Sequence, residues 1–215
     1  MIKKRTKEII EIFDKEFGTT IVHYLDYENA WQLLVATTLS AQCTDARVNI
    51  VTKELFKKYP SIDALASANL KDVEEIIRST GFYHNKAKNI IGSMKEVRDR
   101  FHGVVPSGIE ELTSLPGVGR KTANVVRGNI FHEPSVVVDT HVKRVSNRLK
   151  LTKNQDPVKI EMDLMKELPK DHWILFNIQA IAFGRKICHA RGPKCDICSF
   201  QRYCKKYQED MKGKI

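Results

Sequence analysis

The chain has 215 residues, of which 42% are hydrophobic, and this is enough for a packed core in one large domain or two small ones. Its formal net charge of +10 favours a polyanionic partner, nucleic acid before an anionic membrane surface, with a generally basic, well-solvated surface as the plain alternative. The N-terminus lacks the apolar run of a secretion signal, and no apolar stretch is long enough to span a bilayer, so we expect a cytoplasmic protein.

Apolar residues recur at helical spacing in most of the chain, beginning with Ile9, Ile10, Phe13 and Phe17. Further helices are expected around residues 33–38, 73–77, 90–101, 109–114, from 120 onwards, 142–149 and 162–168, with proline and glycine between them. Residues 136–138 are the one short candidate for a strand, and the polar tail from residue 205 is expected to be frayed. The sequence therefore predicts an all-α fold.

The segment LPGVGRKTANVV, residues 115–126, combines two glycines with a basic pair and a hydroxyl, which suggests a phosphate site. It is neither a Walker A loop, which needs glycine directly before Lys121, nor a dinucleotide fingerprint, which needs a third glycine after the second. Between two short helices, Gly117 and Gly119 can adopt positive φ and expose N–H groups beside those of the second helix. Such a helix-hairpin-helix, here about residues 108–127, is typical of sequence-independent DNA binding, and an unliganded glycine-rich turn is the alternative.

Two residues in and after this hairpin have both a functional and a structural interpretation. Lys121 faces the positive end of the helix dipole beside Arg120, which disfavours the ammonium form and suits a nucleophile, whereas simple phosphate contact is the alternative. Arg120 and Thr122 are expected to help hold phosphate, although Thr122 also has the alternative role of satisfying the helix start. Asp139, in VVVDTHVKRV, is expected to cap the next helix, and a carboxylate fixed in this way also suits catalysis beside a nucleophilic lysine.

Four of the five cysteines form a cluster with the spacing C-x6-C-x2-C-x5-C, namely Cys188, Cys195, Cys198 and Cys204. One Cys-x-x-Cys core with two flanking thiols in a reducing compartment indicates a metal site, and the spacing leaves zinc and iron–sulfur open. Seven Lys or Arg and one acidic residue lie between residues 185 and 206, so the loop with Arg191 and Lys194 suits a DNA backbone.

These features occur in the same order in the endonuclease III family of helix-hairpin-helix DNA glycosylases, which the sequence resembles over nearly its whole length. The motifs that carry the resemblance are LSAQCTD (39–45), GFYHNKAKNI (81–90), LPGVGRKTANVV, VDTHV (138–142) and the four-cysteine tail. The last three motifs are specific in combination, whereas a single helix-hairpin-helix is much less so.

The resemblance implies two lobes, a six-helix barrel and a second lobe around a 4Fe–4S cluster. In this chain the lobes correspond to about residues 23–133, and to residues 1–22 with 134–215. The four cysteines of residues 188–204 are implied to hold the cluster, which favours iron over zinc. The implied partner is double-stranded DNA with a damaged pyrimidine or an abasic site, bound by a monomer.

The resemblance also assigns roles in a base-excision reaction. Lys121 matches the family's nucleophile, which attacks C1′ of a flipped nucleotide, displaces the base and forms an imine that permits β-elimination. Asp139 matches the catalytic carboxylate, which stabilises positive charge on the sugar and assists proton transfers. The implied enzyme is a bifunctional DNA glycosylase and abasic-site lyase.

Four further positions match the family's motifs. Gln42 corresponds to the residue that fills the gap left by the flipped base, with an ordinary exposed amide as the alternative. Phe82 stands where the family commonly has an apolar wedge, often leucine, with core packing as the alternative. Asp45 and His141 match positions near the DNA cleft, and a structural role is the alternative for both.

Three other functions compete with this one. A monofunctional mismatch glycosylase for thymine, uracil or adenine has the same fold, but monofunctional relatives lack the hairpin lysine. The adenine-specific relatives also carry a catalytic glutamate in the helix before the SAQ motif, and WQLLVATTLS contains no carboxylate. A non-enzymatic DNA-binding module is expected to have lost Lys121 or Asp139, and this sequence keeps both. A redox protein is the weakest alternative, because the sequence shows no features for binding a redox partner.

Overall fold

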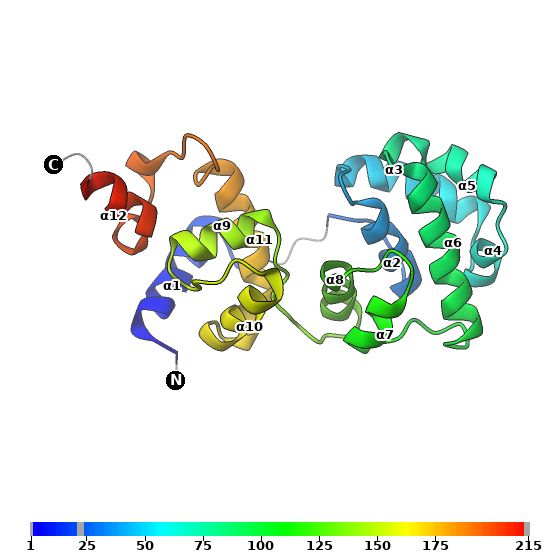
Figure 1. The fold of residues 1–215 in the computed structure, drawn as a ribbon, viewed down its shortest axis with the longest axis horizontal. Coiled ribbons are helices and arrows are strands. Elements are labelled where there is room, and N and C mark those ends of the chain that lie inside the picture. Colours follow the sequence, from blue (N-terminus) through cyan, green and yellow to red (C-terminus); the bar gives the residue numbers. More distant parts are fainter. Residues whose placement is uncertain (1, 21–23, 213–215) are drawn as a thin grey trace. The chain divides into compact units, whose positions relative to one another are not determined.

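The computed structural model describes residues 2–20 and 24–212, and all regular elements in these ranges are helices (Figure 1). The α-helices are α1 (Lys4–Phe17), α2 (Ala30–Leu39), α3 (Asp45–Lys58), α4 (Ile62–Ala66), α5 (Leu70–Ile77), α6 (Tyr83–Asp99), α7 (Ile109–Ser114), α8 (Arg120–Ile130), α9 (Thr140–Arg148), α10 (Pro157–Glu167), α11 (Trp173–Lys186) and α12 (Lys205–Lys212). The 3-10 helices are η1 (Arg78–Thr80), η2 (Lys170–His172), η3 (Cys195–Ile197) and η4 (Gln201–Tyr203). The prediction of an all-α fold is confirmed. The candidate strand at 136–138 was wrong, because Val136 is buried in a helical core instead of pairing with a strand of the described chain.

The C-terminal tail also differs from its prediction, since residues 205–212 form helix α12 rather than a frayed end. The helix carries two ion pairs, each between residues one turn apart, Lys205–Glu209 at 3.6 Å and Lys206–Asp210 at 2.8 Å. Pairs at this spacing stabilise a helix by about 0.2–0.5 kcal/mol each. The helix is therefore supported locally. The last residues of the tail, 213–215, lie outside the described residues.

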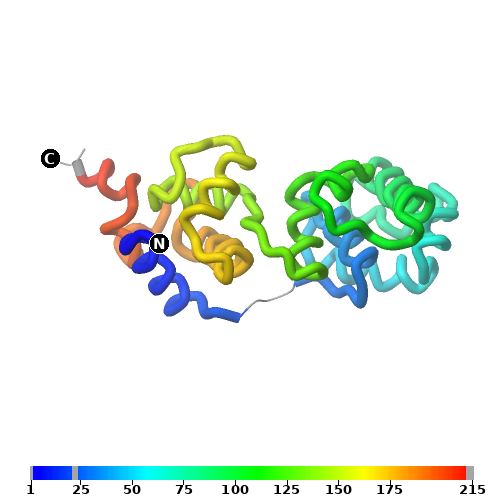
Figure 2. Tube along the Cα trace, turned by 90° about the horizontal axis from the view of Figure 1, so that it is seen from below, coloured from blue at the N-terminus to red at the C-terminus, as the bar shows by residue number. Residues whose placement is uncertain are grey.

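The chain divides into two compact units, residues 23–133 and residues 1–22 with 134–215. Each unit has its own hydrophobic core. The first contains α2 to α8, and the second contains α1 and α9 to α12. The N-terminal helix α1 thus belongs to the same unit as the C-terminal helices (Figure 2). The expected boundary near residue 23 lies outside the described residues.

Helix α2 lies in the core of the 23–133 unit, and its residues from Trp31 to Leu39 are all buried. A helix that is apolar on all sides is expected where other helices enclose it. Its start is fixed by Asn29, whose side-chain oxygen accepts a hydrogen bond from the Gln32 amide at 3.2 Å. Helix α2 packs against α3, α6 and α8, and α8 also packs against α7. The α7–α8 hairpin is therefore attached directly to the core.

Aromatic rings form the centre of the other unit. Phe13 of α1 packs with Phe176 and Phe183 of α11 and with Phe200, at ring-centroid distances between 4.5 and 5.7 Å. Each buried aromatic ring removes a large apolar area from water, so this cluster fixes α1 against α11. Because Phe200 lies between two of the clustered cysteines in the sequence, the same core also supports the cysteine loop.

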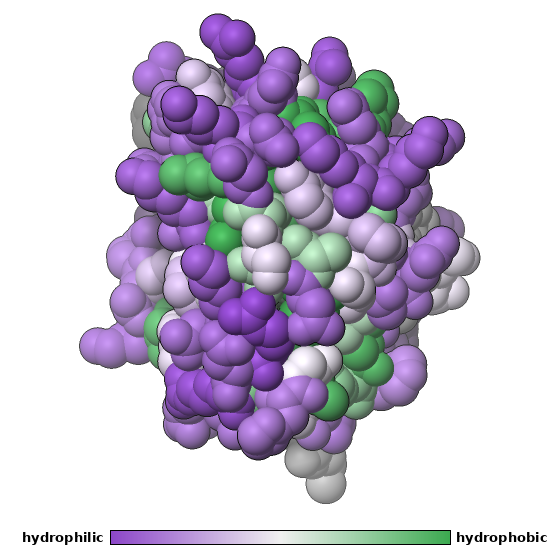
Figure 3. All heavy atoms as spheres, turned by 90° about the vertical axis from the view of Figure 1, so that its right-hand side faces the viewer, coloured by the Kyte–Doolittle hydropathy of each residue, from purple (hydrophilic) through white to green (hydrophobic). Residues whose placement is uncertain are grey.

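The face of the 23–133 unit that carries α4 and α5 is mainly hydrophilic, with apolar atoms gathered near its centre (Figure 3). In the part of the chain that the structure describes, no helix is both long and apolar enough to cross a membrane.

Candidate functional site

The LPGVG loop joins α7 to α8, and these helices lie where the sequence predicts them. Both glycines can adopt positive φ, but only Gly117 does so, with φ 73°, whereas Gly119 has φ −85° and ψ 170°. The reason is that Gly119 is the N-cap of α8, a position that takes extended backbone. Without a side chain Gly119 provides no cap, so the first N–H groups of α8 receive no side-chain acceptor from it.

Helix α6 fixes the backbone of this hairpin. The Ser93 hydroxyl donates to the Pro116 carbonyl at 2.7 Å, and a Cβ on Gly92 would lie 3.2 Å from Cγ of Pro116. A Cβ on Gly117 would lie only 2.6 Å from the Asn89 side chain. The sequence analysis missed these residues of α6. The available signal was the position of Ser93 among the apolar residues Ile90, Met94 and Val97 of the same helix.

Lys121 is the second residue of α8, and its side chain is exposed. Arg120 and Thr122, on either side of it, are half-buried. The amine therefore stands beside the N–H groups that the hairpin offers to a phosphate. A helix start of this kind can bind an anion, and an exposed amine beside it is accessible to a ligand.

Two further loops of the same unit carry exposed side chains on unfavourable backbone. Gln42, between α2 and α3, has φ 54°, and Phe82, the N-cap of α6, has φ 48°. The left-handed region costs residues with a Cβ about 1–2 kcal/mol. Phe82 is 67% exposed, which excludes core packing for this side chain. Asp45 is half-buried at the first position of α3, and Lys86, which the sequence analysis missed, is buried beneath the two loops.

Asp139 caps α9 in the other unit. Its Oδ1 accepts a hydrogen bond from the Val142 amide at 2.7 Å, so the predicted cap is confirmed. The side chain is half-buried, and the cap fixes the orientation of the whole carboxylate. His141, the second residue of α9, is half-buried against Gly184 of α11, where an added Cβ would lie 3.3 Å from the His141 ring.

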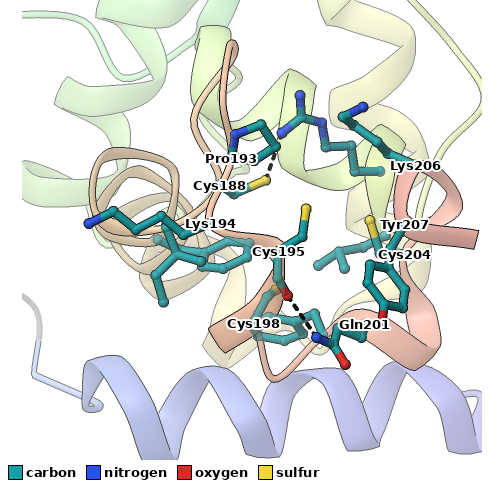
Figure 4. Close-up of a pocket in the computed structure, with 14 residues that line it drawn as sticks. Cys188, Pro193, Lys194, Cys195, Cys198, Gln201, Cys204, Lys206 and Tyr207 are labelled. Atoms are coloured by element: carbon teal, nitrogen blue, oxygen red, sulfur yellow. Dashed lines mark hydrogen bonds between the residues drawn. The ribbon is translucent and has the colours of Figure 1, made fainter. Parts of the chain in front are cut away.

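The four cysteines line one pocket within this unit (Figure 4). The sulfur atoms of Cys188, Cys195 and Cys204 point toward its centre, and all four residues are free thiols. Burial raises the pKa of Cys198 to about 11, so its thiolate needs compensating positive charge. Among the described residues, no group of three or more His, Cys, Asp or Glu side chains is arranged to hold a metal ion.

The remaining lining of the pocket fits an anionic group that is ligated by thiolates. Its walls include the buried apolar side chains of Phe183 and Phe200. Lys194 and Lys206 contribute positive charge at its edge. Arg191, in the same loop, is exposed and faces no part of this lining.

Arg148, the last residue of α9, holds the cysteine loop. Its Nη1 lies 3.1 Å from the sulfur of Cys188 and donates to the His189 carbonyl at 2.8 Å, while Nη2 donates to Ala190 at 3.3 Å. One turn earlier, Arg144 donates to the Cys188 carbonyl at 3.0 Å. The sequence analysis missed both arginines. The available signal was their spacing of four residues on one face of α9.

The candidate residues divide between the two units. Residues 23–133 contain Gln42, Asp45, Phe82, Gly117, Gly119, Arg120, Lys121 and Thr122, and the other unit contains Asp139, His141, Arg191, Lys194 and the four clustered cysteines. The structure brings the hairpin residues together on one loop and the cysteines together around one pocket.

Comparison with known proteins defines the class first. Residues 35–170 match the model of the HhH-GPD superfamily base excision DNA repair protein, so the fold and the hairpin are those of a base-excision repair protein. An endonuclease III from Synechocystis sp. is 52% identical over 94% of this chain and 92% of its own length, and one from Bacillus subtilis is 44% identical over 89% and 88%. A solved structure of a trapped endonuclease III–DNA covalent intermediate matches 98% of this chain and 100% of its own with a TM-score of 0.86 and 40% identity. The chain belongs to the endonuclease III family of the HhH-GPD superfamily.

Proposed function

We propose that this chain is a DNA glycosylase and abasic-site lyase that removes oxidised pyrimidines from duplex DNA. The observation that carries the proposal is the exposed Lys121 on the first turn of the hairpin helix, in a chain of this family. The neighbour described as a covalent endonuclease III–DNA intermediate supports a nucleophile that bonds to the substrate. We propose that the protein acts as a monomer on chromosomal DNA in the cytoplasm.

In the proposed first step, the neutral amine of Lys121 attacks C1′ of the damaged nucleotide. The N–C1′ bond forms, the glycosidic bond breaks, and its electron pair leaves with the base. The negative charge of Asp139 stabilises the positive charge that develops on the sugar, and its carboxylate accepts the proton that the attacking nitrogen releases.

In the proposed second step, ring opening gives an imine between Lys121 and the sugar. The imine makes the C2′ hydrogen acidic, because it accepts the electron pair that the departing proton leaves behind. Loss of this proton then breaks the C3′–O bond, and the phosphate leaves on the 3′ side. A single lysine thereby accounts for both base removal and strand cleavage.

The proposed DNA interface uses the basic charge of the chain and three loops. The N–H groups at Gly117, Gly119 and the start of α8 bind one backbone phosphate. Phe82 wedges the duplex and Gln42 occupies the space of the flipped nucleotide, which offsets part of the cost of unstacking it. Asp45 and His141 are assigned to the surroundings of the damaged base, and Arg191 and Lys194 to the DNA backbone.

We further propose that Cys188, Cys195, Cys198 and Cys204 hold a 4Fe–4S cluster. The four thiols, the apolar lining and the flanking cations of their pocket support this assignment. When bound, the cluster supplies four metal–sulfur bonds that cross-link the loop, and it takes no part in the steps above. Iron and acid-labile sulfide in stoichiometric amounts are expected in the purified protein, whereas zinc without sulfide would contradict the assignment.

The test is a duplex that carries one thymine glycol, incubated with the wild type, Lys121→Gln and the matched control Lys95→Gln. Lys95 is an exposed lysine of α6 outside the proposed site. The wild type and the control are expected to release the base and nick the strand, and Lys121→Gln to give no product above background. Base release that leaves only alkali-labile sites, with no nick, would indicate a monofunctional glycosylase instead.

A further inference from the structure

Lys86 of α6 is buried although it is a lysine. Its side chain is 5% exposed, and among the described residues it is the only lysine or arginine that is buried. An ammonium group in such a place is costly unless it is fully hydrogen-bonded. Burial accordingly lowers the pKa of Lys86, and the nearby Cys43 thiol opposes this effect in part. A role that needs a charged donor at this point explains a lysine better than packing does.

The hydrogen bonds of Lys86 join two segments that are distant in sequence. Its Nζ donates to the carbonyl of Leu39 at 2.9 Å and to the carbonyl of Thr80 at 2.8 Å. Leu39 is the last residue of α2, and Thr80 is the last residue of η1. Carbonyls at helix ends lack helical partners and carry the negative end of the dipole, so an ammonium satisfies both.

Each of these carbonyls stands at the start of one of the two loops with exposed, left-handed residues. Gln42 follows Leu39 by three residues, and Phe82 follows Thr80 by two. A left-handed residue with a Cβ persists only where its surroundings fix it. Lys86 also donates its own backbone N–H to the Phe82 carbonyl at 3.1 Å. One buried side chain therefore fixes the base of both loops.

We propose that Lys86 is a positioning residue for DNA distortion, which holds the Gln42 loop and the Phe82 loop in one fixed relation so that both side chains enter the duplex together. The proposal rests on the proposed function, because it assumes that these two residues enter DNA. Lys86 itself touches neither the damaged base nor the reacting sugar in this role. Its loss is expected to affect distortion of the duplex rather than phosphate binding by the hairpin.

The test compares Lys86→Met, which keeps the length of the side chain without its donors, with Lys86→Gln, which keeps one donor group. Lys95→Met on the exposed face of α6 is the matched control for loss of charge. Two quantities are measured with folded protein, the single-turnover excision of thymine glycol and the fluorescence of 2-aminopurine opposite a non-cleavable abasic analogue. Each substitution is also made in a Gln42→Ala/Phe82→Ala background.

Lys86→Met is expected to slow excision by about 10- to 100-fold and to remove the 2-aminopurine signal, since a small misplacement has effects of this size. Lys86→Gln is expected to be intermediate, and it serves as the test if the methionine variant does not fold. The affinity of Lys86→Met for undamaged duplex should stay within about twofold of wild type. The excision rate of the control Lys95→Met should also stay within about twofold of wild type. In the Gln42→Ala/Phe82→Ala background, Lys86→Met should change the rate by less than about twofold, because residues that act through one another are not additive.

The outcomes separate this inference from the proposed function. A wild type that neither excises nor nicks the lesion overturns the proposed function and this inference with it. An active wild type with an equally active Lys86→Met overturns the inference alone. An equal loss of rate in both backgrounds also overturns it, because Lys86 would then support only the stability of the unit.

Discussion

Asp139 and Arg148 lie at opposite ends of helix α9, and each fixes one of its ends. Asp139 caps the first turn through the Val142 amide, and Arg148 binds the sulfur of Cys188 at 3.1 Å. A helix of nine residues is about 13 Å long and stiff over that length. One short helix therefore carries the proposed catalytic carboxylate at its start and the contact with the cysteine loop at its end.

Replacing Arg148 with methionine should loosen the cysteine loop. The change removes several hydrogen bonds from a charged donor, and one such bond contributes about 1.5–3 kcal/mol, so the free energy of unfolding should fall by at least this amount. Iron should also be lost faster to a chelator, as followed by visible absorbance. Lys153→Met, at an exposed lysine of the same unit, is the control. Identical iron loss and stability in the two variants would mean that Arg148 does not hold the loop.

Asp139 offers a way to separate its cap from its charge. Asp139→Asn keeps an oxygen for the Val142 amide, so unfolding in urea should change by less than about 0.5 kcal/mol, whereas Asp139→Ala should lose about 1 kcal/mol. Excision should fall in both variants by about 10²- to 10⁴-fold, because both lose the carboxylate that assists proton transfer. Full activity in Asp139→Asn would leave capping as the function of this residue.

The two hairpin glycines should respond differently to a methyl group. Gly117→Ala meets both a left-handed backbone at φ 73° and the Asn89 side chain at 2.6 Å, so its thermal stability should drop clearly. Gly119→Ala has φ −85° and no atom within 4 Å of the new Cβ, so its stability should change by less than about 0.5 kcal/mol. Its affinity for undamaged duplex should nevertheless fall, because the methyl group stands where a phosphate approaches. Unchanged affinity would argue against phosphate binding at this turn.

The stabilisation that His172 gives to the unit of residues 1–22 and 134–215 should decrease as pH rises. Burial disfavours its charge, but hydrogen bonds to Asp171 at 2.8 Å and Asp14 at 3.2 Å outweigh this, and its pKa is raised from 6.5. The stabilisation is therefore complete below about pH 6.5 and is lost as pH rises through the folded-state pKa. The free energy of unfolding of the wild type should exceed that of His172→Gln by about 0.5–1.5 kcal/mol at pH 5.5, and by less at pH 8.5. A difference that does not change with pH would contradict this assignment.

The sequence predicted local features well because they depend on neighbours in the chain. The apolar spacing located the helices, and the turn between Ser114 and Arg120 followed from its glycines and proline. The cap at Asp139 followed from a short acceptor before an apolar helical face. The φ of Gly119 could not be predicted, because glycine is compatible with both the extended and the left-handed backbone.

The residues that position the candidate site were not predictable in the same way. Lys86 reaches Leu39 across 47 residues, and Arg148 reaches Cys188 across 40. The spacing of two arginines marks a shared helical face, but it does not identify a partner at such a distance. The exposure of Phe82 was also open, since an aromatic residue before a helix is as compatible with a core as with a surface. These features depend on how the helices pack, which local patterns do not encode.

The central claim is that Lys121 bonds to the sugar of the damaged nucleotide, and borohydride trapping tests it most directly. The protein is mixed with a thymine glycol duplex, the imine is reduced, and the covalent protein–DNA product is digested and mapped by mass spectrometry. One cross-linked product is expected, with the sugar on Lys121, and none from Lys121→Gln. A product attached to another residue, or an equal amount from Lys121→Gln, would contradict it.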